Sequence, residues 1–227
     1  MLSKLLVSAL FAGAAAGLIA GILQFLFVQP VLLHAELYEN GTLTHFGTSI
    51  ASSRPELPDF APLRDLLSIV FTMFIYTGYA MILVALMLFA EERGADVSVS
   101  AGFSWGITGF VAAHLAPAFS LAPEVPGAAA ADIGARQIWW FATVAAAGIA
   151  MWFIAFGRNW MIWGISVILL TAPHIIGAPQ PDTFAGPVPP EIAALFAARA
   201  LGVGFASWAI LGCLAAYFLD KEQRRQS

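Results

Sequence analysis

The sequence contains few of the residues on which soluble domains and redox proteins depend. It has one cysteine, Cys213, in 227 residues, so it forms no disulfide framework and offers no cysteine-rich metal site. Charged residues make up only 11% of the chain, whereas about a quarter is usual for a soluble domain. The formal net charge is −4 and no basic patch stands out, which argues against nucleic acid as a partner. These scarcities together indicate an integral membrane protein.

The motifs of several common chemistries are also missing. The sequence has no glycine-rich phosphate loop, so this chain is not expected to hydrolyse ATP. It has no His-Glu-x-x-His motif, and its single cysteine excludes a dithiol redox pair within the chain. We therefore expect neither an enzyme nor a prosthetic group.

Long apolar runs are what the chain has in abundance, since 60% of its residues are hydrophobic. A helix needs about 20 apolar residues to cross a bilayer. These runs predict an all-α, polytopic membrane bundle that forms one domain over residues 1–227, with six spans, or five if the short fifth run, which ends at Pro173, does not cross. Only Arg158 and Asn159 separate the fourth and fifth runs, which predicts a tight helical hairpin. The runs cover residues 5–30, 66–90, 99–120, 137–157, 159–177 and 193–219.

The basic residues predict an orientation. Under the positive-inside rule, loops rich in Lys and Arg stay in the cytoplasm. Six basic residues then lie on the side of both termini: Lys4, Arg93, Arg158, Lys221, Arg224 and Arg225. Four lie on the other side: Arg54, Arg64, Arg136 and Arg199. We expect cytoplasmic termini and place all four histidines at or near the outer face: His34, His45, His114 and His174.

A Pro-Glu-aliphatic triplet occurs three times ahead of an arginine that opens an apolar run. The stretches read PELPDFAPLR, APEVPGAAAADIGAR and PEIAALFAAR. An arginine in the first turn of a helix faces the end of the macrodipole that favours anions, so it needs a partner. We predict that each pair pins an outer loop to a helix end, or else that the loops form an acidic vestibule that attracts cations. The pairs are Glu56 with Arg64, Glu124 with Arg136, and Glu191 with Arg199.

These recurring stretches suggest a repeat. Each unit would be an ascending helix, a proline-rich outer loop and a descending helix, giving three hairpins at 1–93, 94–158 and 159–227. Separately, Gly13, Gly17 and Gly21 recur every fourth residue, which predicts a face for close helix packing.

The histidines are the candidate metal ligands. His114 and His174 each lie near a proline, Pro117 or Pro173, about 15 residues into an ascending helix. Neutral imidazole is a common ligand for cobalt, nickel, copper and zinc. The alternative is that each histidine only donates a hydrogen bond to a carbonyl that the proline leaves unpaired. Further candidates lie in the outer segments: His34, Glu36 and Glu39 as a collecting site, and Glu124.

Several segments resemble the CbtA family of bacterial cobalt transporter subunits. They are QFLFVQPVLLHAELYE, HLAPAFSLAPEVPG, ARQIWW and APHIIGAPQPD. The resemblance implies a cytoplasmic-membrane protein, usually of five spans, that transports cobalt(2+) with CbtB, a small single-span subunit with a histidine-rich segment. The motif positions that match are His114, Pro117, Glu124, Arg136, Gln137, His174 and Arg199.

The residues and the resemblance together predict a transmembrane subunit for uptake of cobalt or a related divalent metal. Two alternatives belong to other classes. The chain could be an electron carrier in which His114 and His174 ligate one b-type haem, or a membrane scaffold that stabilises another subunit without transporting anything.

Overall fold

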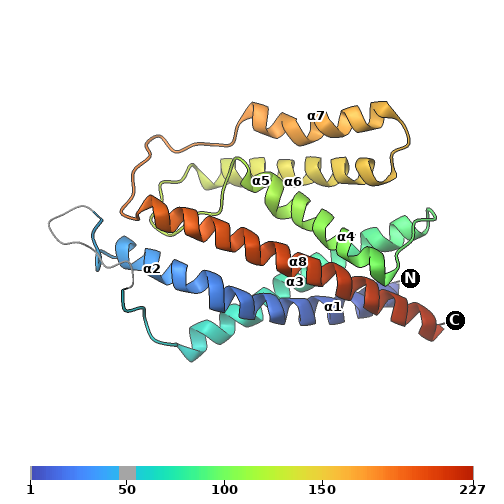
Figure 1. Cartoon of the computed structure of the whole chain (residues 1–227), viewed down its shortest axis with the longest axis horizontal. Helices are drawn as coiled ribbons and strands as arrows, with labels where there is room; N and C mark the ends of the chain where they lie inside the picture. Colours follow the sequence, from blue (N-terminus) through green and yellow to red (C-terminus); the bar gives the residue numbers. More distant parts are fainter. Residues whose placement is uncertain (1, 46–54, 227) are drawn as a thin grey trace. The chain divides into compact units, whose positions relative to one another are not determined.

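The computed structural model describes residues 2–45 and 55–226, and these fold into helices and loops without any β-strand (Figure 1). The predicted all-α class is therefore confirmed for the described chain. Arg54, used above for orientation, lies outside the described residues. The longer helices are α1 (Leu2–Leu23), α2 (Gln29–Glu39), α3 (Pro62–Glu91), α4 (Val99–Phe110), α6 (Ile133–Phe156), α7 (Trp160–Ile176) and α8 (Pro190–Gln226).

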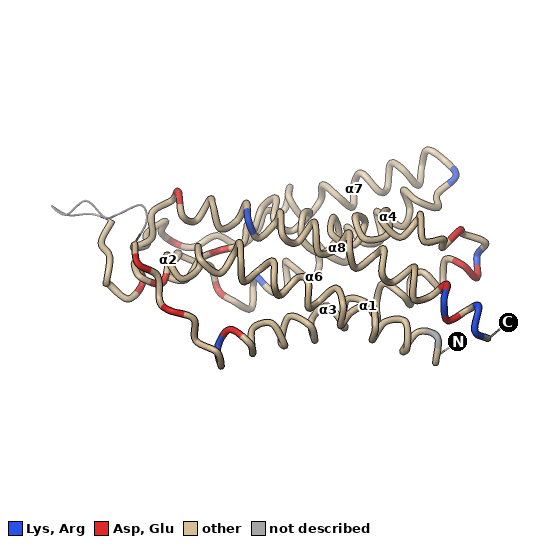
Figure 2. The backbone as a smooth tube through the Cα atoms, turned by 60° about the horizontal axis from the view of Figure 1, so that its bottom comes forward, with Lys and Arg blue, Asp and Glu red and all other residues tan. Residues whose placement is uncertain are grey.

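Five helical segments of the described chain are long and apolar enough to cross a membrane. Figure 2 shows charged residues mainly near helix ends and in loops, with long uncharged stretches between them. Helix α7 has only 17 residues and falls short of the same length. Six spans and three repeats therefore stay predictions. The five segments are Leu5–Glu39, Pro62–Glu91, Val99–Ala118, Ile133–Phe156 and Pro190–Arg225.

The predicted hairpin at Arg158 is confirmed. Helices α6 and α7 run side by side in opposite directions (Figure 1), and the chain turns between them over a few residues. Asn159 caps α7, because its side chain accepts a hydrogen bond from the Ile162 N–H at 2.9 Å. A capping side chain satisfies a backbone donor that the first turn leaves unpaired, which explains why the new helix begins here.

The chain divides into two compact units, and the first is built on glycine. This unit contains Met1–Leu26, Phe60–Phe110 and Gly202–Ser227. In it α1 packs against α3 so closely that a Cβ atom added to Gly13 would lie 2.3 Å from the Thr77 Cα, and one added to Gly17 would lie 2.5 Å from the Met73 Cα. Gly21 meets Ile69 in the same way, so the predicted small-residue face is confirmed.

A second glycine contact lies in the same unit, between α4 and α8. A Cβ atom on Gly106 would lie 2.2 Å from the Trp208 carbonyl oxygen, and one on Gly212 would lie 2.2 Å from the Gly102 carbonyl oxygen. Close backbone approach increases van der Waals contact, which helps to drive helix association where the surrounding lipid is as apolar as the side chains.

Two wide helical turns interrupt otherwise continuous helices. The π-helical segments are η1 (Gln24–Val28), which joins α1 to α2, and η2 (Val111–Leu115), which joins α4 to α5 (Ala116–Ala118). A proline follows each one, Pro30 or Pro117. Because proline lacks an N–H and its ring clashes with the carbonyl four residues earlier, a wider turn lets the helix continue. The helix is thus widened ahead of Pro117 and continues as α5.

Adding one methyl group at the α1–α3 contact should destabilise the protein. We expect Gly17→Ala to lower the free energy of unfolding by about 1–3 kcal/mol, the usual range for overpacking. The matched control is Gly78→Ala on α3, where an added Cβ has no atom within 4 Å and the helix gains about 0.5–1 kcal/mol of propensity. Reversible unfolding in mixed micelles measures both variants, and equal effects would refute the close-packing explanation.

Candidate functional site

The second unit contains Phe27–Asp59 and Val111–Leu201, and its proline-rich loops are fixed by aliphatic side chains. Val125 and Ile192 are only 4% and 8% exposed and pack in one cluster against Val31, Ala35 and Tyr38 of α2. Both belong to Pro-Glu-aliphatic triplets, and each directly follows the glutamate that we had singled out. The buried member of these two triplets is therefore the aliphatic residue, whereas Leu57 of the first triplet is 37% exposed.

One of the three predicted ion pairs is present. Arg136 in the first turn of α6 forms a salt bridge with Glu124 through its Nη2 atom. Their side chains are 26% and 30% exposed, and such partly exposed pairs contribute no more than about 1 kcal/mol. Asp132 caps the same helix by accepting a hydrogen bond from the Ala135 N–H at 2.9 Å. Two polar contacts thus hold the loop to α6, and Val125 is buried separately against α2.

The predicted pair of Glu56 and Arg64 is wrong. Arg64 pairs instead with the next residue, Asp65, at 2.7 Å between Nε and Oδ1. Asp65 is 1% exposed, and its other carboxylate oxygen accepts a hydrogen bond from the Ala61 N–H at 2.9 Å. The Asp65 carboxylate thus binds both the Ala61 N–H and the Arg64 guanidinium, so Arg64 does not need the loop glutamate as a partner. Glu56 is exposed. Asp65 lies in the first turn of α3, where the helix dipole favours an acid, and it competes with Glu56 for the adjacent Arg64.

The predicted pair of Glu191 and Arg199 is also wrong. Helix α8 begins at Pro190, so both residues lie in one helix, eight positions and about 12 Å apart along its axis. Arg199 donates instead from Nη1 to the backbone carbonyl of Phe27, at 3.0 Å. Phe27 lies in the wide turn η1, three residues before Pro30. The Arg199 guanidinium thus serves as a side-chain donor to a backbone carbonyl. Glu191 remains exposed in the first turn of α8.

His174 lies in the last turn of α7 within a tightly defined environment. Its Nδ1 atom is 2.8 Å from the Ser120 hydroxyl oxygen, and its ring meets the rings of Phe119 and Trp139 edge-on at 4.9 Å and 5.9 Å. Trp139 in turn donates from its indole nitrogen to the Pro173 carbonyl at 3.2 Å. Sequence reasoning missed Ser120 and Trp139 as neighbours, because neither lies near His174 along the chain.

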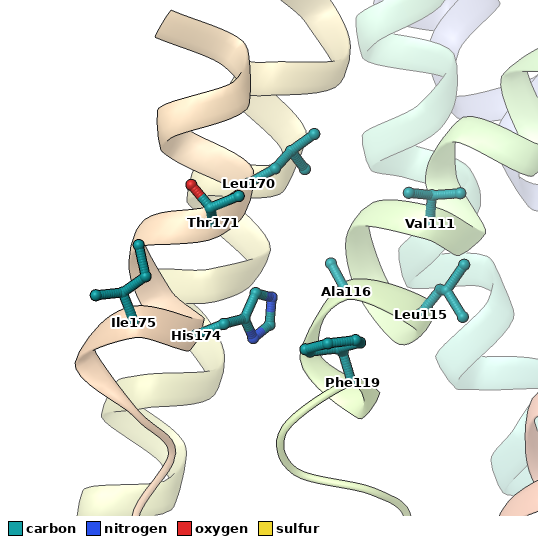
Figure 3. Close-up of a pocket in the computed structure, with 8 residues that line it drawn as sticks. All are labelled: Val111, Leu115, Ala116, Phe119, Leu170, Thr171, His174 and Ile175. Atoms are coloured by element: carbon teal, nitrogen blue, oxygen red, sulfur yellow. The ribbon is translucent and has the colours of Figure 1, made fainter.

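A half-open cavity of about 550 Å³ adjoins His174, between α7 and the η2–α5 segment. Figure 3 shows the imidazole reaching from α7 across the cavity toward Phe119. The other polar lining side chain, Thr171, bonds to the Val167 carbonyl of its own helix at 2.8 Å. The remaining lining residues are apolar: Val111, Leu115, Ala116, Phe119, Leu170 and Ile175. His174 is thus the lining side chain with ligand chemistry, and His114, although on η2, does not line this cavity.

The outer residues His34, Glu36 and Glu39 lie on α2, and helical geometry separates the first two. Residues two apart in an α-helix point about 200° away from one another. The Nε2 atom of His34 is buried without a hydrogen-bond partner, and its ring lies 5.7 Å from that of Tyr38. Glu36 is half-buried and Glu39 is exposed. Across residues 2–45 and 55–226, no three His, Cys, Asp or Glu side chains are grouped as a metal site. Gln137 is exposed on α6.

The apolar helices, the glycine contacts and the satisfied caps define a polytopic helical membrane protein. The model of the CbtA family, described as a probable cobalt transporter subunit, matches residues 2–220. The chain therefore belongs to the CbtA family, and it is a transporter subunit rather than an enzyme. No curated protein and no solved structure matches the chain.

The aliphatic members of the triplets should matter more for stability than the acids. We expect Ile192→Ala to cost about 2–5 kcal/mol, because it leaves a cavity in the cluster around α2. Glu191→Gln at the neighbouring exposed position should change the free energy of unfolding by no more than about 1 kcal/mol, through its interaction with the helix dipole. The free energy of unfolding of both variants is measured by reversible unfolding in mixed micelles. A larger loss from Glu191→Gln would mean that the acid anchors the segment.

Proposed function

We propose that this chain is the transmembrane subunit of an uptake system for cobalt(2+), and that it works with a small single-span subunit of the CbtB type rich in histidine. The observation that carries the proposal is the family match over residues 2–220, nearly the whole chain. The description of the family as a subunit supports the existence of a partner. That the partner is single-span and rich in histidine is what the resemblance to the family implies.

Imidazole supplies the chemistry that we propose for ion passage. Divalent first-row metals accept imidazole nitrogen and carboxylate oxygen. A hydrogen bond from Nδ1–H of His174 to Ser120 would leave the Nε2 lone pair free for a metal, since the bond at one ring nitrogen sets the state of the other. Further proposed metal donors lie in the outer segments: His34, Glu36, Glu39 and Glu124. His114 is a proposed donor on η2. The lining around His174 is apolar, so an ion there would keep water ligands or take donors from the partner.

The proposed energy source is the membrane potential. A charge that crosses about 100 mV gains about 2.3 kcal/mol, so a divalent cation gains about 4.6 kcal/mol when it moves toward the negative side. That gain corresponds to more than a thousandfold concentration ratio at equilibrium. Entry down this potential therefore needs no nucleotide hydrolysis, in keeping with the absence of a phosphate-binding motif in this sequence.

The proposed location is the bacterial cytoplasmic membrane, with both termini in the cytoplasm and six spans. The short helix α7 is the demanding part of this topology. Its 17 residues extend about 26 Å, against a hydrocarbon core of about 30 Å. A short helix can still cross if the bilayer thins locally around it. Its antiparallel pairing with α6 supports a return across the membrane.

Cysteine labelling tests this topology. With Cys213 replaced by Ser, we expect Asn159→Cys to react with an impermeant thiol reagent only after the membrane is opened, and Pro126→Cys to react in intact cells. The two positions lie at opposite ends of α6, which makes them a matched pair. Labelling of Asn159→Cys in intact cells would refute the six-span orientation.

Metal-resolved uptake tests the function. Cells without other cobalt transporters should accumulate cobalt when they express this chain with its partner, and little when they express either alone. Nickel and zinc assayed in parallel define selectivity. Equal accumulation with and without this chain would refute the transport proposal and favour a scaffold.

Histidine variants test the ligand assignments. We expect His174→Gln and His114→Gln each to reduce initial cobalt uptake at least tenfold, because an amide retains hydrogen bonding but is a poor metal ligand. Thr171→Val is the matched control, since it lines the same cavity while its hydroxyl bonds only within α7. Expression and thermal stability should be unchanged in all three. Wild-type uptake in both glutamine variants would show that the histidines are structural.

A further inference from the structure

A small cavity lies in the first unit, beside the C-terminal part of α8 and the N-terminal part of α1. Its volume is about 110 Å³, room for about three or four water molecules at about 30 Å³ each. From α8 it is lined by residues spaced three, four and seven apart, which is one face of a helix. The lining residues are Val7 and Phe11 of α1 with Phe218, Lys221, Glu222 and Arg225 of α8.

One side of this cavity is apolar and the other is cationic. The rings of Phe11 and Phe218 stack at 5.6 Å between centroids with 26° between their planes, and Phe11 is 60% exposed. Lys221 and Arg225 are exposed and lie one helical turn apart. Their nearest carboxylate in the lining, Glu222, is 3.9 Å from the Arg225 guanidinium, long for a charge-assisted hydrogen bond, so the guanidinium retains donors for another anion.

The depth of the cavity along the helices gives a second, independent indication. The apolar span that contains α1 begins at Leu5, and the span in α8 ends at Arg225. The charged residues at the C-terminal end of α8 begin at Asp220, so Lys221 and Arg225 lie at the polar end of that span, where lipid headgroups are expected. Basic pockets between membrane helices at this level are suited to anionic headgroups.

We propose that this cavity binds the phosphate group of an anionic phospholipid. Lys221 and Arg225 hold the phosphate oxygens, and the exposed face of Phe11 contacts the first part of an acyl chain. Two cations against one carboxylate leave a net positive charge for the phosphate. The volume suits a phosphate group and excludes a whole lipid, whose chains lie outside along α1. The apolar side favours a lipid over free phosphate. This proposal does not depend on which ion the protein transports.

Native mass spectrometry of the full chain, released from detergent with added lipid, tests the proposal. We expect phosphatidylglycerol to bind more tightly than phosphatidylcholine. Each basic residue is expected to contribute about fivefold to the affinity for an anionic lipid. The double variant Lys221→Gln/Arg225→Gln should therefore bind phosphatidylglycerol about 30-fold more weakly. The control is Arg224→Gln, which removes one neighbouring charge and is compared with Arg225→Gln alone, for which the expected loss is about fivefold. Arg224 does not line the cavity and pairs with Asp220 at 3.0 Å, so binding should change less than twofold.

Two further arms keep the outcome decisive. Lys221→Arg retains the charge and should retain binding, so loss in the glutamine variant alone reports charge rather than misfolding. Excess inorganic phosphate should not displace the lipid, because it lacks the apolar contact with Phe11. The proposal is overturned if Arg224→Gln weakens binding as much as the double variant does, if the double variant binds normally, or if inorganic phosphate competes with the lipid.

Discussion

Backbone carbonyls that lose their usual donors must find others, because the hydrocarbon layer contains no water to replace them. Two carbonyls near prolines of this chain accept hydrogen bonds from side chains. Arg199 donates to the Phe27 carbonyl in the wide turn that precedes Pro30. Trp139 donates to the Pro173 carbonyl in the last turn of α7, which also accepts from the Gly177 N–H at 3.0 Å. Arg199, which was predicted to hold a loop carboxylate, is thus committed to the backbone.

A chain with so little charge must also fix its loops by apolar burial. The contrast is clearest after α5, where Glu124 and Val125 are neighbours with different roles. The glutamate lies in a partly exposed ion pair, whereas the valine is 4% exposed in a cluster with α2 and the start of α8. The same division holds at Glu191 and Ile192. Burial of the aliphatic residue therefore holds both segments in place.

Structural features that depend on short stretches of sequence were predictable. Features that depend on where a helix begins or on tertiary contacts were not. Apolar length predicted the helices, the short link at Arg158 predicted the hairpin, and four-residue spacing predicted the glycine face. The pairing of Glu191 with Arg199 failed because α8 begins at Pro190, which puts both residues in one rigid helix. The neighbours of His174 could not be predicted, since Ser120 lies 54 residues away and meets it only through tertiary packing. Local chemistry in the sequence cannot specify such distant contacts.

The wide turn η2 amounts to one extra residue inserted into a helix. An α-helix turns about 100° per residue, so this insertion sets the rotational phase of all that follows it. Shortening η2 by one residue would leave the local composition nearly unchanged, but it would bring the Pro117 ring against the carbonyl four residues earlier. It would also swing Ser120 about 100° around the axis, away from His174. The contact between these two side chains therefore depends on the count of residues between Val111 and Pro117 as much as on their identity.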